Sequence, residues 1–199
     1  PEAGCPLVCD MSSDILSRPV DVSKYAVIFA GAQKNMAPAG LTVVIIDKSI
    51  AGNELPITPL MLSYKRMIDK DSMYNTPPCY NIYMLGLVLD WIIGRGGVEA
   101  MQKLRDERSS MLYNFLDGSS VFRGCAEPAA RSGMNVTFRA ATPELEAEFI
   151  RESAAAGFVN LKGHRSVGGM RASIYNAMPV EGVEKLIAFM KDFEVKHHA

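Results

Sequence analysis

Two apolar runs separated by a short turn constrain the fold of this chain most strongly. The runs are Val-Ile-Phe-Ala at residues 27–30 and Leu-Thr-Val-Val-Ile-Ile at residues 41–46. Neither run alternates between apolar and polar side chains, so both are predicted to be strands that are apolar on both faces. Strands of this kind belong to a parallel or mixed sheet whose two faces are covered. The sequence therefore predicts an α/β fold.

The overall composition is that of an ordinary globular protein. Of the 199 residues, 48% are hydrophobic and 22% are charged, which is close to the average for soluble domains. The net charge of −1 and the lack of a basic block argue against nucleic acid as the main partner. No apolar run reaches the length of about 20 residues that a membrane span needs. Without a signal-peptide pattern at the start, the sequence predicts a cytoplasmic protein with no nucleic-acid or membrane partner.

The start of the sequence predicts that part of the protein is missing. The chain begins with Pro-Glu-Ala-Gly rather than with Met, and a short apolar run over residues 7–9 follows almost at once. Because an α/β protein seldom starts so abruptly, we expect this chain to be a fragment or one chain of a nicked protein.

The cysteines and histidines do not form a metal-binding pattern in the sequence. Cys5 and Cys9 have the spacing CxxxC, and no second pair stands at the spacing of zinc ligands. The adjacent pair His197-His198 would point in two different directions. We therefore expect no metal site, and we expect free thiols in a reducing compartment.

A change in helix character near Gly96-Gly97 predicts a domain boundary. The stretch NIYMLGLVLDWIIG, which begins at residue 81, is apolar nearly all round, so we expect a helix that is buried on several sides. A second helix over residues 98–116 has one apolar stripe and a solvated face. The charged residues assigned to that face are Lys103, Arg105, Asp106, Glu107 and Arg108. We therefore predict a first domain of residues 1–97 and a second, smaller α+β domain of residues 98–199.

The second domain is predicted to combine antiparallel strands with two further helices. The segments GMNVTFRAA and GGMRASIYNA alternate between apolar and polar residues, as half-buried strands do. Between them, Thr142 is placed as the N-cap of a helix with Pro143 at its first position. Gly157 is placed to end this helix, and a last amphipathic helix covers residues 179–196.

A single lysine, Lys34, lies on the small-residue turn between the two apolar runs, and Gly31 and Gly40 bracket the turn. A lysine at a strand end is most often a solvated surface residue. Next to two core strands, however, its ammonium group would be poorly hydrated, which lowers the pKa and makes the amine nucleophilic. Lys34 is therefore a candidate for a lysine that forms a Schiff base.

Asp10 follows the apolar run at residues 7–9, so it lies at the carboxyl end of a predicted strand. In open α/β sheets, ligands bind at that edge. Taken alone, Asp10 is explained equally well as a cap for the segment that begins Met-Ser-Ser. Together with Lys34, it completes the pair that a pyridoxal-phosphate site needs: an amine for the aldehyde and a carboxylate for the pyridine nitrogen.

The segment LKGHRSVGGMRASIYN, residues 161–176, places Lys162, His164, Arg165 and Arg171 among glycines. The simplest interpretation is a solvated basic hairpin on the surface. The functional interpretation is an anion site, because arginine binds carboxylate and phosphate through paired hydrogen bonds. Arg171 lies in a strand-like run, so its position suits a carboxylate anchor.

Four segments together resemble one enzyme family: VCDMSS, VIFAGAQKNMAPAGLTVVII, YNTPPCYNIYMLGLVLDWI and LKGHRSVGGMRASIYNAMPVEGVEKLIAFM. They are similar to the C-terminal part of the phosphoserine aminotransferase family of fold-type I pyridoxal-phosphate enzymes. The similarity runs nearly end to end and is weakest over residues 119–156. It implies that residues 1–97 form the C-terminal part of the large, mixed-sheet cofactor-binding domain and that residues 98–199 form the small α+β domain.

The resemblance implies five cofactor-binding residues. Lys34 would form the Schiff base with pyridoxal 5′-phosphate, Asp10 would bind the pyridine nitrogen, and Gln33 would bind the cofactor phosphate. Asn75 and Thr76 would contact the phosphate of the cofactor in the other subunit of a homodimer.

The resemblance also implies the substrates. Arg171 would bind the α-carboxylate, and His164 and Arg165 would bind the phosphate of the substrate. The implied reaction moves an amino group between glutamate and 3-phosphohydroxypyruvate, which gives 2-oxoglutarate and O-phospho-L-serine for serine biosynthesis.

The resemblance also shows what these residues lack. In the family, the N-terminal half supplies a glycine-rich phosphate turn and an aromatic ring that stacks on the pyridine. The single tryptophan, Trp91, belongs to a predicted helix and cannot be that ring. We therefore expect the isolated chain to be inactive. The alternatives are a fold-type I aminotransferase for another small amino acid and a non-catalytic or proteolytic fragment.

Overall fold

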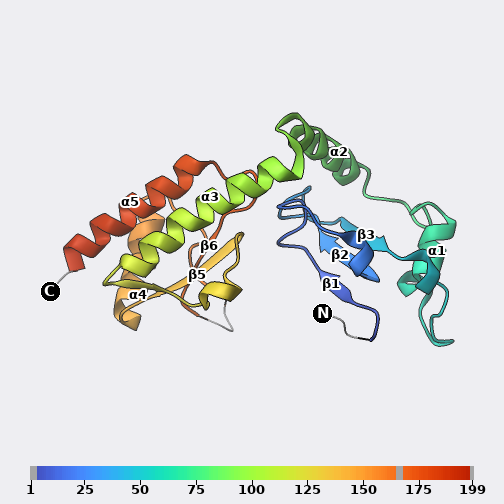
Figure 1. Cartoon of the computed structure of the whole chain (residues 1–199), viewed down its shortest axis with the longest axis horizontal. Helices are drawn as coiled ribbons and strands as arrows, with labels where there is room; N and C mark the ends of the chain where they lie inside the picture. Colours follow the sequence, from blue (N-terminus) through green and yellow to red (C-terminus); the bar gives the residue numbers. More distant parts are fainter. Residues whose placement is uncertain (1–3, 165–167, 198–199) are drawn as a thin grey trace. The chain divides into compact units, whose positions relative to one another are not determined.

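The computed structural model describes residues 4–164 and 168–197 (Figure 1). The chain divides into two compact units, Pro1–Val98 and Glu99–Ala199. Each unit has its own three-stranded sheet and its own cluster of buried apolar side chains. No helix in the described residues is long and apolar enough to cross a membrane. The cysteines are free thiols, as the sequence predicts.

The sheet of the first unit is mixed, as predicted. Its strands are β1 (Val8–Asp10), β2 (Val27–Gly31) and β3 (Thr42–Ile46), in that order. The central strand β2 runs parallel to β1 and antiparallel to β3. The parallel pairing places the carboxyl ends of β1 and β2 at the same edge.

Only the central strand of this sheet is largely buried. Along β2, Ile28 and Ala30 are almost completely inaccessible to solvent. In contrast, Val8 on β1 is 57% exposed and Ile45 on β3 is 42% exposed. The prediction that both apolar runs are covered on both faces is therefore wrong for residues 41–46. The reason is that β3 is an edge strand and the described elements of this unit leave much of its surface uncovered.

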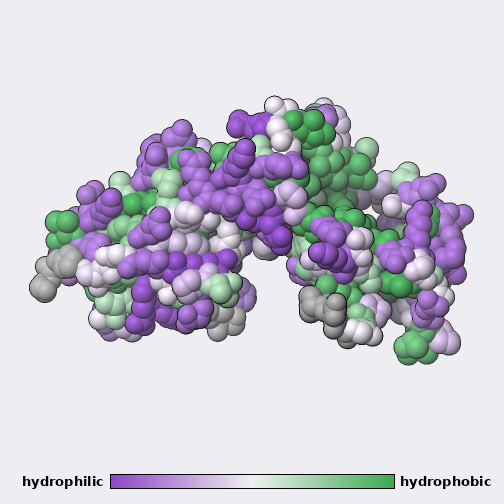
Figure 2. All heavy atoms as spheres, viewed as in Figure 1, coloured by the Kyte–Doolittle hydropathy of each residue, from purple (hydrophilic) through white to green (hydrophobic). Residues whose placement is uncertain are grey.

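The rest of the first unit is built from short helical segments and one long helix. These are the 3-10 turns η1 (Val22–Lys24), η2 (Lys48–Ile50) and η3 (Leu60–Leu62) and the helices α1 (Tyr64–Asp69) and α2 (Cys79–Gly94). The expectation that α2 is buried on several sides is wrong, because only Ile92 is buried and Ile93 is 71% exposed. Figure 2 shows apolar side chains gathered at the surface over α2. The described elements of this unit are too few to cover an all-apolar helix.

The second unit is an antiparallel sheet packed against three helices. The strands β4 (Phe122–Gly124), β5 (Asn135–Ala140) and β6 (Met170–Ser173) pair in sequence order. The helices are α3 (Gly97–Gly118), α4 (Pro143–Ala155) and α5 (Val180–His197), and one 3-10 turn, η4, covers Pro128–Ala130. Burial alternates strictly along β5 and β6, which confirms the prediction of half-buried strands.

The boundaries of α4 follow from its capping residues. Thr142 has an extended backbone, and its side chain accepts a hydrogen bond from the backbone N–H of Leu145 at 3.3 Å. Pro143 stands at the first helical position. After the helix, Gly157 has a φ of +90°, a conformation that glycine adopts without strain. Both predicted ends of this helix are confirmed.

Phenylalanine side chains form the centre of the core in the second unit. Phe149 of α4 lies 5.0 Å from the ring of Phe122 on β4 and 5.3 Å from the ring of Phe193 on α5, both centroid to centroid. Phe138 on β5 packs edge-on against Phe149 at 6.1 Å. These four rings are at most 2% exposed, so they join the sheet to both α4 and α5.

The sequence predicts that Arg108 lies on the solvated face of α3, and this prediction is wrong. Its residue surface is only 1% exposed. Its Nη1 donates to the carbonyl oxygens of Tyr175 at 3.3 Å and Asn176 at 3.1 Å, and also to that of Met178. The guanidinium therefore binds three carbonyls of the turn that precedes α5. Burial lowers the pKa of Arg108, and the negative charge of Glu107 opposes this shift.

Candidate active site

The carboxyl edge shared by β1 and β2 carries the candidate site. Asp10 is the last residue of β1 and lies opposite Phe29 of β2. The chain leaves β2 at Gly31 and turns sharply through Lys34 before β3 begins. Ligands bind at this edge in open α/β sheets, because the loops there leave the sheet and expose polar groups.

Three hydrogen bonds join the loop after β1 to the loop after β2. The backbone N–H of Gly31 donates to Ser12 Oγ at 2.9 Å. The ammonium group of Lys34 donates to Ser13 Oγ at 2.6 Å. The side-chain amide of Asn35 donates to a backbone carbonyl of the first loop, that of Ile15, at 2.9 Å. The two loops therefore hold each other in place, and Lys34 is bound at the seam between them.

Asp10 is exposed, and its carboxylate interacts with the residue two positions further on. The Oδ1 atom accepts hydrogen bonds from the backbone N–H of Ser12 at 2.8 Å and from Ser12 Oγ at 2.6 Å. The side-chain hydrogen bond from Ser12 is the largest cause that lowers the pKa of Asp10, and the charge of Lys34 lowers it further. The Oδ1 atom therefore closes a turn, but none of the described helices begins at Asp10. Among the described residues, Oδ2 has no hydrogen-bond partner.

The turn that carries Lys34 is closed by its own backbone. The N–H of Met36 donates to the carbonyl of Ala32 at 3.0 Å, and the N–H of Ala32 donates to the carbonyl of Leu41 at 2.9 Å. Ala32 and Met36 are buried, whereas Lys34 is half-buried. The turn therefore fixes the backbone of the lysine and leaves part of its side chain accessible.

Gln33 lies against the end of β2. A Cβ atom placed on Gly31 would be only 2.8 Å from Oε1 of Gln33. A side chain at position 31 would therefore displace the end of the glutamine side chain, which lies over the strand end. Gln33 is exposed, so its amide is available to a ligand at this edge.

Four polar residues of this edge were missed by sequence reasoning: Ser12, Ser13, Asn35 and Asn81. The position of Ser12 and Ser13 directly after Asp10 was the signal that could have found them. Asn81 had no such signal, because it lies at the start of α2. Its side chain donates to the carbonyls of Pro38 at 3.1 Å and Ala39 at 2.8 Å, and it thereby joins α2 to the loop after Lys34.

Asn75 and Thr76 lie in the irregular segment between α1 and α2 and are both exposed. The side-chain amide of Asn75 donates to the carbonyl of Thr76 at 3.3 Å. In the described part of the chain, neither side chain forms a hydrogen bond with the edge that carries Lys34.

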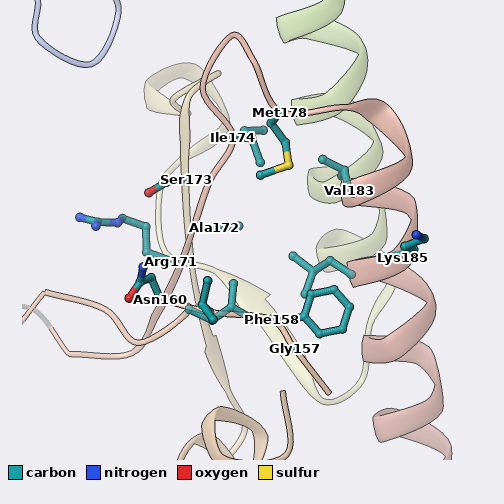
Figure 3. A pocket seen from close by; sticks show the side chains of 14 residues that line it. Gly157, Phe158, Asn160, Arg171, Ala172, Ser173, Ile174, Met178, Val183 and Lys185 are labelled. Atoms are coloured by element: carbon teal, nitrogen blue, oxygen red, sulfur yellow. The ribbon is translucent and has the colours of Figure 1, made fainter. Parts of the chain in front are cut away.

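Arg171 belongs to the second unit, on β6 opposite Thr137. Figure 3 shows its side chain pointing away from α5, on the other side of the strand from Ile174 and Val183. Its Nε is buried and has no hydrogen-bond partner among the described residues. Arg171 also lines a cavity of about 360 Å³ next to α5.

His164 follows Gly163, whose backbone N–H donates to the carbonyl of Gly169 at 2.8 Å. A Cβ on Gly163 would be 2.2 Å from the carbonyl oxygen of Gly168, so only glycine fits there. The side chain of His164 is exposed. Arg165 lies outside the described residues.

The fold and the edge geometry agree with the family to which the chain belongs. Residues 1–186 match the family model described as aminotransferase class-V, and the chain therefore belongs to this family. The predicted fold-type I architecture is confirmed, because solved aminotransferases superpose on nearly the whole chain. One of them, the phosphoserine aminotransferase from Bacillus circulans subsp. alkalophilus, has a TM-score of 0.95 and 47% identity and covers 99% of this chain and 55% of its own.

Curated relatives carry the same name. The phosphoserine aminotransferase of Laribacter hongkongensis is 57% identical over 198 residues, which is 99% of this chain and 55% of the relative. The chloroplastic phosphoserine aminotransferase 2 of Arabidopsis thaliana is 56% identical over 96% of this chain and 46% of the relative. The chain thus spans about half the length of the curated relatives it matches. A PLP-bound phosphoserine aminotransferase from Trichomonas vaginalis also superposes, with a TM-score of 0.91, 38% identity and coverage of 96% of this chain and 55% of its own.

Proposed function

We propose that this chain forms the C-terminal part of a phosphoserine aminotransferase with pyridoxal 5′-phosphate as cofactor. The reaction would exchange an amino group between glutamate and 3-phosphohydroxypyruvate and so produce O-phospho-L-serine for serine biosynthesis. The observation that carries the proposal is the edge where Lys34 and Asp10 lie on loops joined by hydrogen bonds, in a chain that is 57% identical to a phosphoserine aminotransferase.

The groups at this edge fit the three parts of pyridoxal phosphate. The accessible amine of Lys34 suits an aldehyde, and the carboxylate of Asp10 suits a protonated pyridine nitrogen. The exposed amide of Gln33 suits the phosphate. The lowered pKa of Asp10 keeps its carboxylate ionised at neutral pH. Bound pyridoxal phosphate supplies an aldehyde for the amino group and a ring that accepts electrons.

Lys34 has two roles in this proposal. Its amine holds the cofactor aldehyde until the amino group of the substrate replaces it. The freed amine would then act as general base and acid: it would take the proton from the Cα of the substrate and deliver it to C4′, the carbon that carries the aldehyde in the free cofactor. Ser13 accepts a hydrogen bond from the ammonium group at 2.6 Å, so it orients the nitrogen between these two tasks.

The basic residues of the second unit would select the substrate. Arg171 on β6 would bind the α-carboxylate, because its side chain points away from α5 (Figure 3) and arginine binds carboxylates through paired hydrogen bonds. His164 and Arg165 would bind the substrate phosphate. A substrate with one carboxylate and one phosphate matches this set better than serine or alanine does.

The remaining parts of the site would come from other polypeptide segments. We propose that the N-terminal half of the enzyme, covalently attached or as a nicked partner, supplies the other half of the cofactor pocket. We also propose a homodimer in which Asn75 and Thr76 reach the cofactor of the other subunit. Their exposed side chains and the exposed apolar surface of the first unit support this. Free thiols support a cytoplasmic location.

The test is to trap the cofactor on the lysine. The chain, alone and together with the N-terminal half of a relative, is incubated with pyridoxal phosphate, reduced with borohydride and analysed by peptide mass spectrometry. We expect a pyridoxyl adduct on Lys34 when both halves are present, and no amino transfer from glutamate in the Lys34→Ala variant. Appreciable turnover by that variant, or an adduct on another lysine, would refute the proposal. Equal rates with phosphoserine and serine would instead favour another amino-acid substrate.

A further inference from the structure

The second unit brings together three metal-ligating side chains that are far apart in the sequence. Glu148 and Glu152 lie one turn apart on α4, and His197 is the last residue of α5. One ligand atom from each, two carboxylate oxygens and an imidazole nitrogen, lie within 4.8 Å of one another. All three residues are partly buried.

Aromatic packing fixes the two helices that carry these ligands. The imidazole of His197 lies over the ring of Phe193, with the ring centroids 4.2 Å apart. Phe193 in turn packs edge-on against Phe149 at 5.3 Å, and Phe149 lies directly after Glu148 on α4. Because Phe149 and Phe193 are at most 1% exposed, the relative position of the ligands is set by the core and not by solvent-exposed loops.

The imidazole of His197 has an unsatisfied nitrogen. Its Nε2 is buried and has no hydrogen-bond partner in the described part of the chain. A buried polar atom without a partner is unfavourable. A neutral imidazole nitrogen is also the most common protein ligand for a transition metal, so His197 is a candidate ligand whose hydrogen-bonding capacity the described residues leave partly unused.

The two carboxylates are held only loosely by cations. Arg151 is 3.5 Å from Glu148 and 3.8 Å from Glu152, and Lys196 is 3.6 Å from Glu152. These distances are long for ion pairs, and the side chains of Arg151 and Lys196 are 72% and 62% exposed. Exposed pairs of this kind are weak, so both cations can move away when a stronger positive charge arrives.

We propose that Glu148, Glu152 and His197 form a binding site for a divalent transition metal of the zinc class. One nitrogen and two carboxylate oxygens suit Zn²⁺ better than Mg²⁺ or Ca²⁺, which prefer oxygen ligands alone. In a tetrahedral zinc site, ligand atoms lie roughly 3.3 Å apart, so the side chains need to move by little more than an ångström. Water completes the coordination, and the ion joins the last turn of α5 to α4.

The test uses this chain with zinc chloride. Its cysteines are alkylated first, because free thiols bind zinc by themselves. We expect native mass spectrometry and calorimetric titration to show one tightly bound Zn²⁺ per chain, and thermal unfolding to shift upward with zinc concentration. Removing a residue that only hydrogen-bonds to a metal ligand typically lowers metal affinity by about 10–100-fold. Removing a ligand itself should cost at least as much, so Glu152→Gln and His197→Phe should each weaken zinc binding by at least about tenfold.

The controls separate this site from adventitious binding. His197→Phe keeps an aromatic ring on Phe193, and circular dichroism without metal shows whether each variant is folded. Glu144→Gln removes an exposed carboxylate from the same helix and should leave zinc affinity unchanged. The proposal is wrong if the two ligand variants bind zinc as the unchanged chain does, or if binding is lost only in His198→Ala.

Discussion

The two units of this chain differ in how completely they bury their apolar side chains. In the second unit, helices and sheet close around Phe122, Phe149 and Phe193, which are at most 2% exposed. In the first unit, Ile45 and Ile93 are 42% and 71% exposed, although both lie in strongly apolar segments. The second unit therefore encloses its own core, whereas the described residues of the first unit leave apolar side chains exposed.

The polar groups follow the same division. In the first unit, side-chain hydrogen bonds of Ser12, Ser13 and Asn35 join two loops at the sheet edge. The second unit uses a buried arginine, Arg108, to hold the turn before α5. One unit is therefore organised around an accessible edge, and the other around a closed interior.

The largest expected effect comes from removing a ring of the closed core. Phe149→Ala should destabilise the second unit by about 3–5 kcal/mol, because the substitution leaves a cavity among four other phenylalanine rings. Ile45→Ala in the first unit should cost about 0.5 kcal/mol or less, since the side chain is already in contact with solvent. Urea unfolding followed by far-UV circular dichroism measures both. Similar losses in the two variants would contradict the division described above.

A smaller effect is expected at Arg108. Arg108→Gln removes the donor to three carbonyls of the turn before α5, and a hydrogen bond that involves a charged group has a net contribution of about 1.5–3 kcal/mol. Because burial of the guanidinium offsets part of this, we expect a loss of about 2 kcal/mol. The matched control is Lys103→Gln on the exposed face of α3, which should change stability by less than about 0.5 kcal/mol. An unchanged unfolding midpoint in Arg108→Gln would show that the turn holds without it.

The loop pair at the candidate site gives a still smaller effect. Asn35 is 6% exposed, and its amide donates to the carbonyl of Ile15. Asn35→Ala should cost about 1 kcal/mol and make the backbone amides around Lys34 exchange faster with solvent. Asn53 makes the same kind of bond in an exposed turn, to Ile50 at 3.1 Å, and Asn53→Ala should have almost no effect. If hydrogen exchange near Lys34 is unaltered in Asn35→Ala, the bond between Asn35 and Ile15 does not stabilise the loop that carries Lys34.

The smallest expected effect concerns two carboxylates whose pKa values are lowered by different means. Ser12 lowers the pKa of Asp10 through hydrogen bonds from a hydroxyl and an amide. The guanidinium of Arg131 lowers the pKa of Asp117, mainly through a hydrogen bond and in part through its charge. Salt screens charges more than neutral hydrogen bonds, so higher ionic strength should raise the pKa of Asp117 more than that of Asp10. Titration followed by carboxyl NMR shifts measures both values.

The same shifts fix the sign of the pH dependence. The folded pKa of Asp10 lies below its unfolded value of about 3.9. Its contribution to stability is therefore complete above that value and is lost as the pH falls through the lower folded value. Ser12→Ala should move the folded pKa of Asp10 back toward the unfolded value and thereby remove this contribution. An unchanged Asp10 titration in that variant would exclude Ser12 as the cause.

Much of the secondary structure could be predicted because it depends on neighbours along the chain. Thr142, Pro143 and Gly157 mark the ends of α4 through local capping and backbone preferences. The alternation of apolar and polar residues along β5 and β6 indicates strands with one buried face, and their burial alternates accordingly. The sequence also places Asp10 at the end of one strand and Lys34 on the turn after another, and the parallel pairing of β1 and β2 brings the two strand ends to the same edge. Their chemical roles remain predictions.

The wrong predictions of burial have a common physical cause. Periodicity shows which face of a helix or strand is apolar, but it does not show which other segment packs against that face. The all-apolar pattern of α2 predicted burial, but the first unit has no described element that covers most of its surface. Arg108 was placed in solvent because its neighbours in the sequence are charged, whereas the turn at residues 175–178 covers it.

By itself, the sequence determined most of the local elements and placed a lysine and a carboxylate, Lys34 and Asp10, at the ends of strands. Local preferences and strand direction are enough for both. Only the tertiary structure decided that Ser13 holds Lys34, that Arg108 is buried, and that Glu148 and Glu152 meet His197. These three outcomes depend on contacts between segments from about 20 to 70 residues apart, and no spacing within one segment encodes such contacts.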